Sequence, residues 1–323
     1  MNPMRRTGCT RQRGAALLTA MIIVALVATL AAAMVWQQWR AVQVEGAERA
    51  RAQSTWILTG ARDFAGLILR EDFKGGGSKT TTLNAPWATP LKEGRLSTFL
   101  ALDKSDSDDN PDAFLSGYLN DAQARFNLLN LVGLSKDDNK TALAAFQLLC
   151  ENLGLDGSVA ARIASGLSAS RGDNGTGGSP DSFLEPKTVE QLVWLGIDRD
   201  SVKRLQPFVV LLDKATAVNV NTAPKEVLAA VAHIDQATAQ RLVQFRQRTP
   251  FQSVENFCIQ AGTPTSCPPA NILTVRSDYF EVSGSLRLGD HVLTERSLVY
   301  RQSNGQLKPL QRERIASLEQ AGG

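Results

Sequence analysis

The sequence of 323 residues has little of what enzymes use for catalysis. It contains two histidines, His233 and His291, and neither has cysteine or acidic neighbours at the spacing of a metal site. It has no phosphate-binding loop, no nucleophile elbow and no paired-cysteine redox motif. We therefore expect a protein that is not an enzyme, with no catalytic residues, no metal ligands and no cofactor.

Acidic residues are absent from the segment 1–14, and charge of either sign is absent from the segment 15–36. The basic residues of the first segment are Arg5, Arg6, Arg11 and Arg13. The second segment is an unbroken apolar run, long enough to span a bilayer as a helix. Arginines before the span predict a cytoplasmic N-terminus. We therefore expect a single-pass protein of the inner membrane, with the chain after Arg40 in the periplasm.

The junction between these segments reads Arg13-Gly14-Ala15-Ala16-Leu17-Leu18. A secretory signal has its cleavage site after the apolar core, whereas a cut after Gly14 would precede it. This arrangement resembles the type III signal of type IV pilins and type II secretion pseudopilins. The resemblance implies that prepilin peptidase removes residues 1–14 and then N-methylates Ala15. The alternative is an ordinary single-span anchor with a basic flank.

Thr19 is the fifth residue after the proposed cut. The resemblance implies a glutamate at this position, whose carboxylate neutralises the α-ammonium of the neighbouring subunit in the filament. A tip subunit has no neighbour ahead of it and does not need that carboxylate, and the K-type pseudopilins are the ones that lack it. The alternative is a membrane threonine that bonds back to its own helix.

Net charge bears on nucleic-acid binding, and the cysteine positions bear on disulfide formation. Removal of the four leader arginines takes the formal charge from +3 to −1, which does not suit an electrostatic nucleic-acid binder. Cys258 and Cys267 enclose a short Pro-rich loop in an oxidising compartment, so we expect a disulfide between them. Cys150, in an apolar helical stretch, is expected to be a buried free thiol.

Helical periodicity continues beyond the span, over residues 37–72. The apolar positions recur at spacings near three and four: Trp39, Val42, Ala50, Ile57, Ala61, Phe64 and Ile68. The glycines after Lys74 end the pattern. This predicts one long helix whose apolar face needs a partner.

Strand patterns occur on both sides of a helical region. Residues 78–123 predict short strands around a turn at Glu93-Gly94, and residues 270–310 predict strands at Ile272–Val275, Tyr279–Leu288 and His291–Tyr300. The two segments should form one antiparallel sheet, with residues 311–323 as a tail.

An acidic stretch, Asp103–Asn110, is predicted to be a hairpin turn. It has oxygen ligands enough for calcium, but it lacks the glycine and the glutamate of an EF-hand loop.

The region 124–269 is predicted to be a helical insertion with two similar units. They open at Phe126–Leu131 and Val218–Pro224, and the second continues with helices over 225–232 and 237–246. We expect Thr222 to cap the first of these helices, and Gly154–Asp156 to hold the equivalent turn of the first unit.

The second unit resembles helix-hairpin-helix modules, which bind DNA phosphates through a Gly-x-Gly turn. His233 and Asp235 occupy the two glycine positions, so the side chains would block and repel a phosphate. The sequence therefore predicts the fold of such a module without nucleic-acid binding.

The whole chain resembles the general secretion pathway protein K family, the large minor pseudopilins of type II secretion. The segments that carry the resemblance are Arg13–Ala15, Trp87–Leu91, Phe126–Leu131, Val218–Pro224 and Ser277–Phe280. The resemblance implies an α+β fold, in which a long N-terminal helix packs on an antiparallel sheet with a large sterile-alpha-motif-like helical insertion. Members often have a Trp- and Asp-rich calcium-binding segment after the first helical unit, but here that position reads Ser168–Asn174.

The resemblance also implies a function and partners. Such a protein forms the tip of the periplasmic pseudopilus and helps initiate its assembly with I-type and J-type minor pseudopilins. Its other partners are the major pseudopilin, the prepilin peptidase and the inner-membrane secretion platform. The alternative is a membrane-anchored DNA receptor of a competence system, which shares the Asn-Thr-Ala segment and the helical hairpin.

Overall fold

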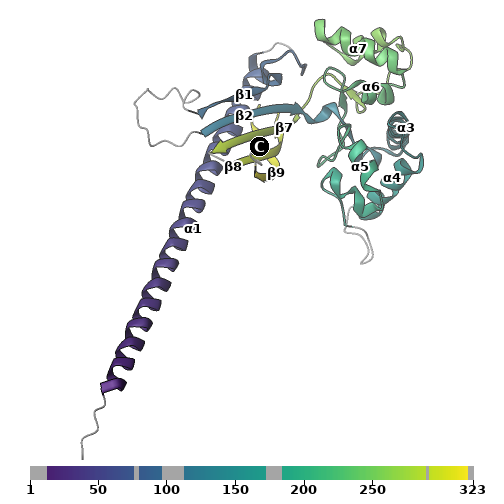
Figure 1. Ribbon diagram of the computed structural model, residues 1–323. Coiled ribbons are helices and arrows are strands. Elements are labelled where there is room, and N and C mark those ends of the chain that lie inside the picture. Colours follow the sequence, from purple (N-terminus) through teal and green to yellow (C-terminus); the bar gives the residue numbers. More distant parts are fainter. Residues whose placement is uncertain (1–12, 76–79, 97–112, 172–183, 289–290, 319–323) are drawn as a thin grey trace, which may run out of the picture. The chain divides into compact units, whose positions relative to one another are not determined.

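The computed structural model describes residues 13–75, 80–96, 113–171, 184–288 and 291–318 (Figure 1). The chain divides into an N-terminal unit, Met1–Ile57, and a C-terminal unit, Leu58–Gly323. Helix α1 (Arg13–Gly75) belongs to both. At both ends it extends beyond the helix that the periodicity predicted, which covered residues 15–72. It ends where the sequence has consecutive glycines, which disfavour a helix.

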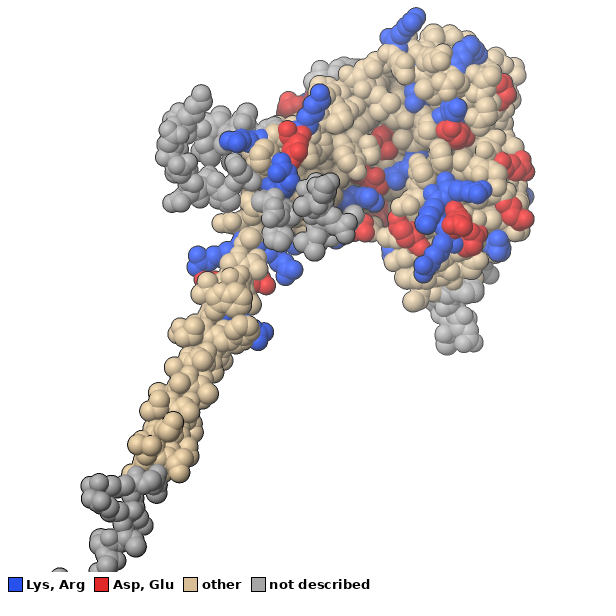
Figure 2. All heavy atoms as spheres, in the orientation of Figure 1, with Lys and Arg blue, Asp and Glu red and all other residues tan. Residues whose placement is uncertain are grey.

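In the N-terminal unit the apolar side chains of α1 are exposed. Leu17, Ile22 and Leu30 are 67%, 59% and 53% exposed, and Trp36 and Trp39 lie with ring centroids 5.6 Å apart. The lower part of α1 carries neither acidic nor basic side chains in Figure 2. This segment makes no core of its own.

The C-terminal unit contains a five-stranded antiparallel sheet in the order β1-β2-β7-β8-β9. The strands are β1 (Leu91–Arg95), β2 (Ala113–Asp121), β7 (Tyr279–Leu288), β8 (His291–Arg301) and β9 (Leu307–Leu318). Asp121 pairs with Phe280, so β2 and β7 are neighbours although a long insertion separates them in sequence. The sheet is therefore assembled from both ends of the chain, as predicted.

The last turns of α1 pack on one face of this sheet. Ala65 and Leu69, four residues apart on the helix, are buried against Phe280 and Val299, together with Trp87 from the short helix η1 (Pro86–Ala88). Residues at this spacing share one helix face. The Trp87 and Phe280 rings meet edge to face at 5.4 Å between centroids.

The insertion consists of two helical repeats. The first helical repeat contains β3 (Phe126–Asn127), η3 (Leu128–Leu131), α3 (Lys136–Asn152), α4 (Ser158–Arg171), η4 (Val189–Leu195), α5 (Arg199–Leu205) and β4 (Val209–Val210). The second contains β5 (Val218–Asn219), α6 (Lys225–Val231), α7 (Gln236–Arg248), α8 (Val254–Ala261) and β6 (Leu273–Thr274). In each repeat the first and last strands pair in parallel.

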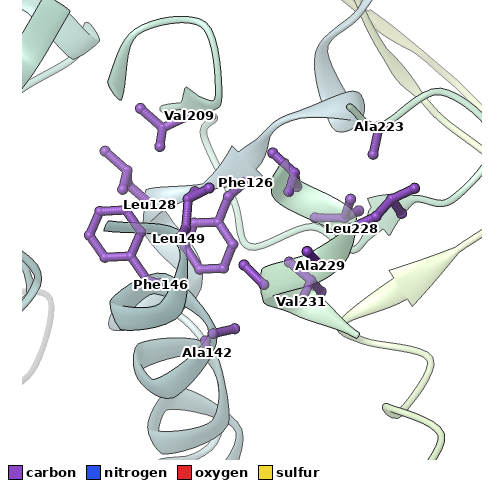
Figure 3. Packing of buried hydrophobic residues seen from close by; sticks show 14 of the residues in the cluster. Phe126, Leu128, Ala142, Phe146, Leu149, Val209, Ala223, Leu228, Ala229 and Val231 are labelled. Carbon is purple, nitrogen blue, oxygen red and sulfur yellow. The ribbon is translucent and has the colours of Figure 1, made fainter. Parts of the chain in front are cut away.

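A single hydrophobic core joins the two repeats. Phe126 and Phe146 stack with centroids 5.3 Å apart, and Leu149 of α3 lies toward Leu228 and Val231 of α6 (Figure 3). All five side chains are almost fully buried. The repeats therefore form one packed body and not two independent modules.

The sheet differs from its prediction at two strands. Glu93 and Gly94 lie inside β1, where the register shifts, and do not form a turn. The expected strand at Ile272–Val275 is reduced to β6, which pairs with β5 outside the main sheet. Local alternation identifies strands but not their partners, because pairing is a long-range property.

The predicted tail is also wrong over residues 311–318, which continue β9. The alternating charges of this segment look like a solvated tail in sequence. In the structure, buried Glu295 of β8 pairs with Arg312 at 2.6 Å and with Arg314 at 3.2 Å, which fastens the strand. The acidic stretch at 103–110 lies outside the described residues.

Candidate functional site

The predicted processing site lies at the start of α1. Arg13, Gly14 and Ala15 have helical backbone, with Gly14 in the first turn. The cut after Gly14 and the methylation of Ala15 remain predictions.

Thr19 makes a local hydrogen bond within α1. Its hydroxyl donates to the carbonyl of Ala16 at 3.0 Å, and Thr29 donates in the same way to Leu26 at 2.9 Å. Such bonds satisfy a hydroxyl that has no water around it. Thr19 therefore suits an apolar environment, but it brings no carboxylate to the position where the resemblance implies one.

Among the described residues, one helix is long and apolar enough to cross a membrane, and it is α1. None of the membrane window of this helix is buried against the other described residues. The helix thus fits a single-pass membrane anchor.

Beyond this segment, α1 has a buried and an exposed face. Leu58, Ala65 and Leu69 are 5% exposed or less, whereas Phe64 and Leu67 are 57% and 55% exposed. The predicted apolar stripe included Phe64, which faces away from the sheet. The helix therefore buries one apolar face against the sheet. A second apolar face has no partner among the described residues.

A buried polar cluster joins the insertion to the sheet, and we call it the Asp121 cluster: Asp121, Asn219, Thr222 and Ser277. The Oδ2 of Asp121 accepts hydrogen bonds from Asn219 Nδ2 at 3.0 Å, Thr222 Oγ1 at 2.6 Å and Ser277 Oγ at 2.5 Å. Its Oδ1 accepts one from the backbone of Gln123 at 2.8 Å. The cluster thus ties the end of β2 to the second helical repeat and to the start of β7.

Thr222 was predicted to cap α6, and this prediction is wrong. The N-cap of α6 is Pro224, and it makes no side-chain cap bond. The Thr222 hydroxyl turns instead to Asp121, a residue about 100 positions earlier. Burial raises the pKa of Asp121, and the hydrogen bonds from Ser277 and Thr222 offset this only in part.

Arg301 extends the cluster to α1. Its guanidinium is buried and donates to the carbonyl of Ser277 at 2.6 Å, to Thr81 Oγ1 at 3.2 Å and to the carbonyl of Leu69 at 3.4 Å. Asp72 lies 3.5 Å away as its ion-pair partner. A cation near a helix C-terminus is also favoured by the helix dipole. One arginine of the sheet therefore connects the end of α1 to the Asp121 cluster.

Asparagines at the start of each repeat use their side-chain amides to hydrogen-bond with backbone groups elsewhere in the same unit. Asn130 exchanges two hydrogen bonds with Thr216, at 2.8 and 2.9 Å, and Asn221 exchanges two with Phe251, at 2.9 and 2.8 Å. All are side-chain amides paired with backbone groups. The sequence showed these asparagines as a repeated pattern, but their partners are too far away along the chain to be inferred.

The turn of the second repeat has the geometry of a helical hairpin but not the chemistry of a phosphate site. His233 adopts a left-handed φ of 51°, where glycine is usual. Asp235 caps α7 by accepting from the Thr238 backbone at 2.9 Å, and the hydrogen bonds from Thr238 lower the pKa of this aspartate. A charged carboxylate at this turn repels phosphate.

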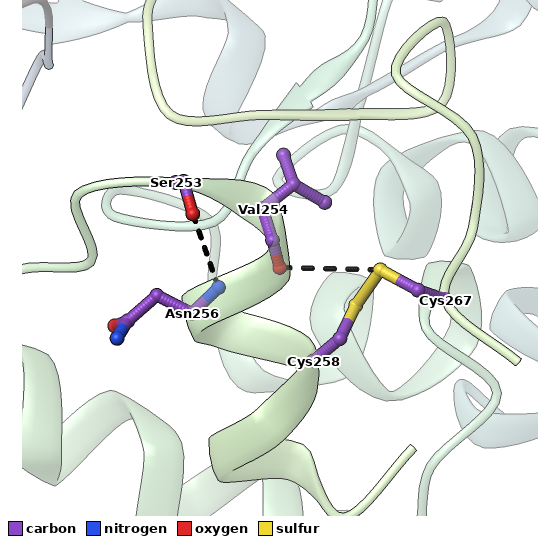
Figure 4. Close-up of a disulfide and its surroundings, with 5 residues drawn as sticks. All are labelled: Ser253, Val254, Asn256, Cys258 and Cys267. Atoms are coloured by element: carbon purple, nitrogen blue, oxygen red, sulfur yellow. Dashed lines mark hydrogen bonds between the residues drawn. A yellow bond between two sulfur atoms is a disulfide. The ribbon is translucent and has the colours of Figure 1, made fainter. Parts of the chain in front are cut away.

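Cys258 of α8 and Cys267 of the following loop form a disulfide, with a Cα–Cα distance of 5.7 Å (Figure 4). Ser253 caps α8 by accepting from the Asn256 backbone at 3.1 Å, so a side-chain cap holds the start of this helix and the disulfide holds its middle. Cys150 is a buried free thiol. Burial, with a smaller contribution from Glu151, raises the pKa of Cys150 to about 12.

The expectation of no cofactor, with calcium left open as an alternative, stays a prediction. The described residues contain no cluster of three or more histidine, cysteine or acidic side chains that could hold a metal ion. The acidic stretch at 103–110 and residues 172–174 lie outside them.

Comparison with known proteins finds similarity to one family. Two models described as type II secretion system protein K match residues 124–214 and 218–275. These ranges correspond closely to the two helical repeats.

Several curated relatives match nearly the whole chain. Type II secretion system protein K of Pseudomonas aeruginosa is 29% identical over 94% of this chain and 92% of its own length. The protein of the same name from Klebsiella pneumoniae is 29% identical, and that from Pectobacterium carotovorum is 27% identical. Both alignments cover 90% of this chain and 93% of the relative.

A solved structure has the same fold. It is a chain of the GspK-GspI-GspJ complex from the type II secretion system of enterotoxigenic Escherichia coli, with a TM-score of 0.65 and 21% identity. The similarity covers 84% of this chain and 99% of that one. Together with the relatives and the two matching models, it shows that the chain is similar over nearly its whole length to type II secretion system protein K.

Proposed function

We propose that this chain forms the tip of the periplasmic pseudopilus and helps initiate its assembly, for export of folded proteins across the outer membrane. The apolar part of α1 anchors it once in the inner membrane, with the N-terminus in the cytoplasm. Prepilin peptidase removes residues 1–14. The role of the chain is structural and not catalytic.

The position of the insertion carries this proposal. Residues 122–278 leave the sheet after β2 and return at β7, and Asp121 and Phe280 are register partners. The helical repeats are therefore attached at one end of two adjacent central strands, and the Asp121 cluster holds them there. A pilin-like subunit with such a body at one end obstructs a further subunit on that side.

The exposed apolar face of α1 supports partners at its sides. Phe64 and Leu67 have no partner among the described residues, and burial of such side chains is favourable by about 1.5–3 kcal/mol each. The similar solved chain comes from a complex with GspI and GspJ. We assign I-type and J-type minor pseudopilins to this face, and the major pseudopilin and the inner-membrane platform to the later steps of assembly.

Thr19 supports the same position in the filament. A subunit without a carboxylate at this place cannot pair with an α-ammonium ahead of it. The steric obstruction by the insertion is independent of this residue, so Thr19→Glu alone should not create a filament subunit.

The test is the position of the chain in pseudopili. In a strain that overproduces the major pseudopilin, immunogold against this chain should mark a single end of each filament, both in the wild type and in Thr19→Glu. Gold particles distributed along the filaments would refute the tip assignment.

A further inference from the structure

An open groove of about 540 Å³ lies between α1 and the turn that joins β8 to β9. One wall is a single face of α1 with Arg62, Gly66 and Arg70, which are spaced four residues apart. The other wall includes Leu307 and Lys308. A Cβ added at Gly66 would lie 3.2 Å from Leu307 Cδ1, so glycine allows the two walls to meet at the floor.

The groove combines an apolar surface with an excess of positive charge. Leu67, which is 55% exposed, and Pro309 contribute apolar surface. Arg70 and Lys308 are exposed, and neither forms an ion pair within the part of the chain that the structure describes. Arg62 pairs with its neighbour Asp63 at 3.2 Å, and this aspartate is the one acidic residue of the described lining.

The spacing of the charges indicates an extended ligand and not a small anion. Arg62 and Arg70 are eight residues apart, which is about 12 Å along a helix axis. Carboxylates separated by two turns of a second helix, on either side of an apolar residue, would match this spacing. Complementary charges at the rim of an interface fix its register and speed association more than they add affinity.

We propose that this groove is the docking site for an acidic amphipathic helix of a neighbouring minor pseudopilin. Its apolar side chain covers Leu67 and Leu307, and its carboxylates face Arg62 and Arg70 along α1 and Lys308 on the opposite wall. This inference rests on the proposed function, since it specifies where on the chain a partner binds and which chemistry the partner must have.

The experiment uses the full chain in detergent, copurified with the I-type and J-type minor pseudopilins of the same genome. The test variant is Arg70→Glu with Lys308→Glu. The control variant is Arg199→Glu with Lys203→Glu, which makes the same change in net charge at two exposed positions of α5. Both variants alter surface residues, and thermal melts establish that they fold.

We expect wild type and control to bind the partners equally, and the test variant to bind at least about tenfold more weakly. Binding of the wild type should weaken between 0.15 M and about 0.5 M salt, since these charges are exposed. Replacing acidic residues of the partner helix with lysine should restore binding to the test variant.

Each other outcome has a distinct meaning. If wild type and test variant bind the partners equally, the groove is not the docking site and the proposed function stands. If the wild type binds neither partner, the proposed function itself fails. If the wild type self-associates and the test variant does not, the occupant is a second copy of this chain, and the assignment to a partner is overturned.

Discussion

The two units of the chain place the same residue types in opposite surroundings. In the N-terminal unit, Leu17 and Leu30 are more than half exposed, whereas in the C-terminal unit Leu69 and Phe280 are fully buried. A helix that packs on the core of a protein in water also needs a polar face toward the solvent, and residues 15–36 have no such face. The comparison shows that apolar content alone does not identify a protein core. The missing polar positions fit a segment that is surrounded by lipid and not by water.

The largest expected effect concerns the basic leader, which precedes the exposed apolar segment of the N-terminal unit. Gly14→Leu should block processing completely, because a peptidase that fits the backbone closely at the cut has no room for a branched side chain. Mass spectrometry of membrane-extracted protein should find residues 1–14 retained in the variant and absent from the wild type. Wild-type protein that keeps its leader in a strain with active prepilin peptidase would contradict the pilin-like signal.

A matched pair of leucine substitutions tests the contrast directly. Leu69→Ala should lower the free energy of unfolding of the C-terminal unit by about 3 kcal/mol, because it leaves a cavity between α1 and the sheet. Leu30→Ala should change it by less than about 0.5 kcal/mol. Denaturant titration of the full chain in detergent measures both. Equal losses would show that the two parts of α1 do not differ as described.

The disulfide sharpens the account of the C-terminal unit. Its loop spans nine positions, so Cys258→Ser with Cys267→Ser should lower stability by about 2–3 kcal/mol. In processed, unreduced protein, thiol reagents should label only Cys150, and only after unfolding. Labelling of Cys258 and Cys267 without a reductant would show that the bond does not form.

The smallest expected effect concerns the pH dependence of the same core. The pKa of Cys150 is about 12 when folded and 9.0 in its ordinary state. Because the folded value is raised, the contribution is complete below pH 9 and is lost as the pH rises toward 12. At pH 10 the wild type should have lost about 1 kcal/mol more than Cys150→Ala, each relative to pH 8. Parallel pH profiles of the two proteins would argue against a buried thiol.

Local patterns predicted the membrane segment, the long helix and the helical hairpins. These features repeat every few residues, so a short window of sequence contains the information. The sheet halves at the two ends of the chain were also recognisable. The resemblance to the protein K family supplied the remaining step, from a set of elements to an architecture and a role.

Long-range polar contacts could not be predicted in the same way. Thr222 satisfies every local rule for a cap, but a buried carboxylate about 100 residues away is the stronger partner. Arg312 and Arg314 look like surface charges until Glu295 is placed beside them. The groove beside Arg70 was equally hidden, because it forms only when α1 meets the β8–β9 turn.

The parallel pairs β3–β4 and β5–β6 have a consequence for how such chains diverge. Each pair brings the first and last residues of a helical repeat side by side, as Phe126 and Val209 are in the first. Because each repeat begins and ends at adjacent points, the segment between its two strands can become longer or shorter while both strands stay in place. The repeats are thus suited to insertions, deletions and grafted domains. The size of this part of the molecule can vary between species without any adjustment of the sheet below it.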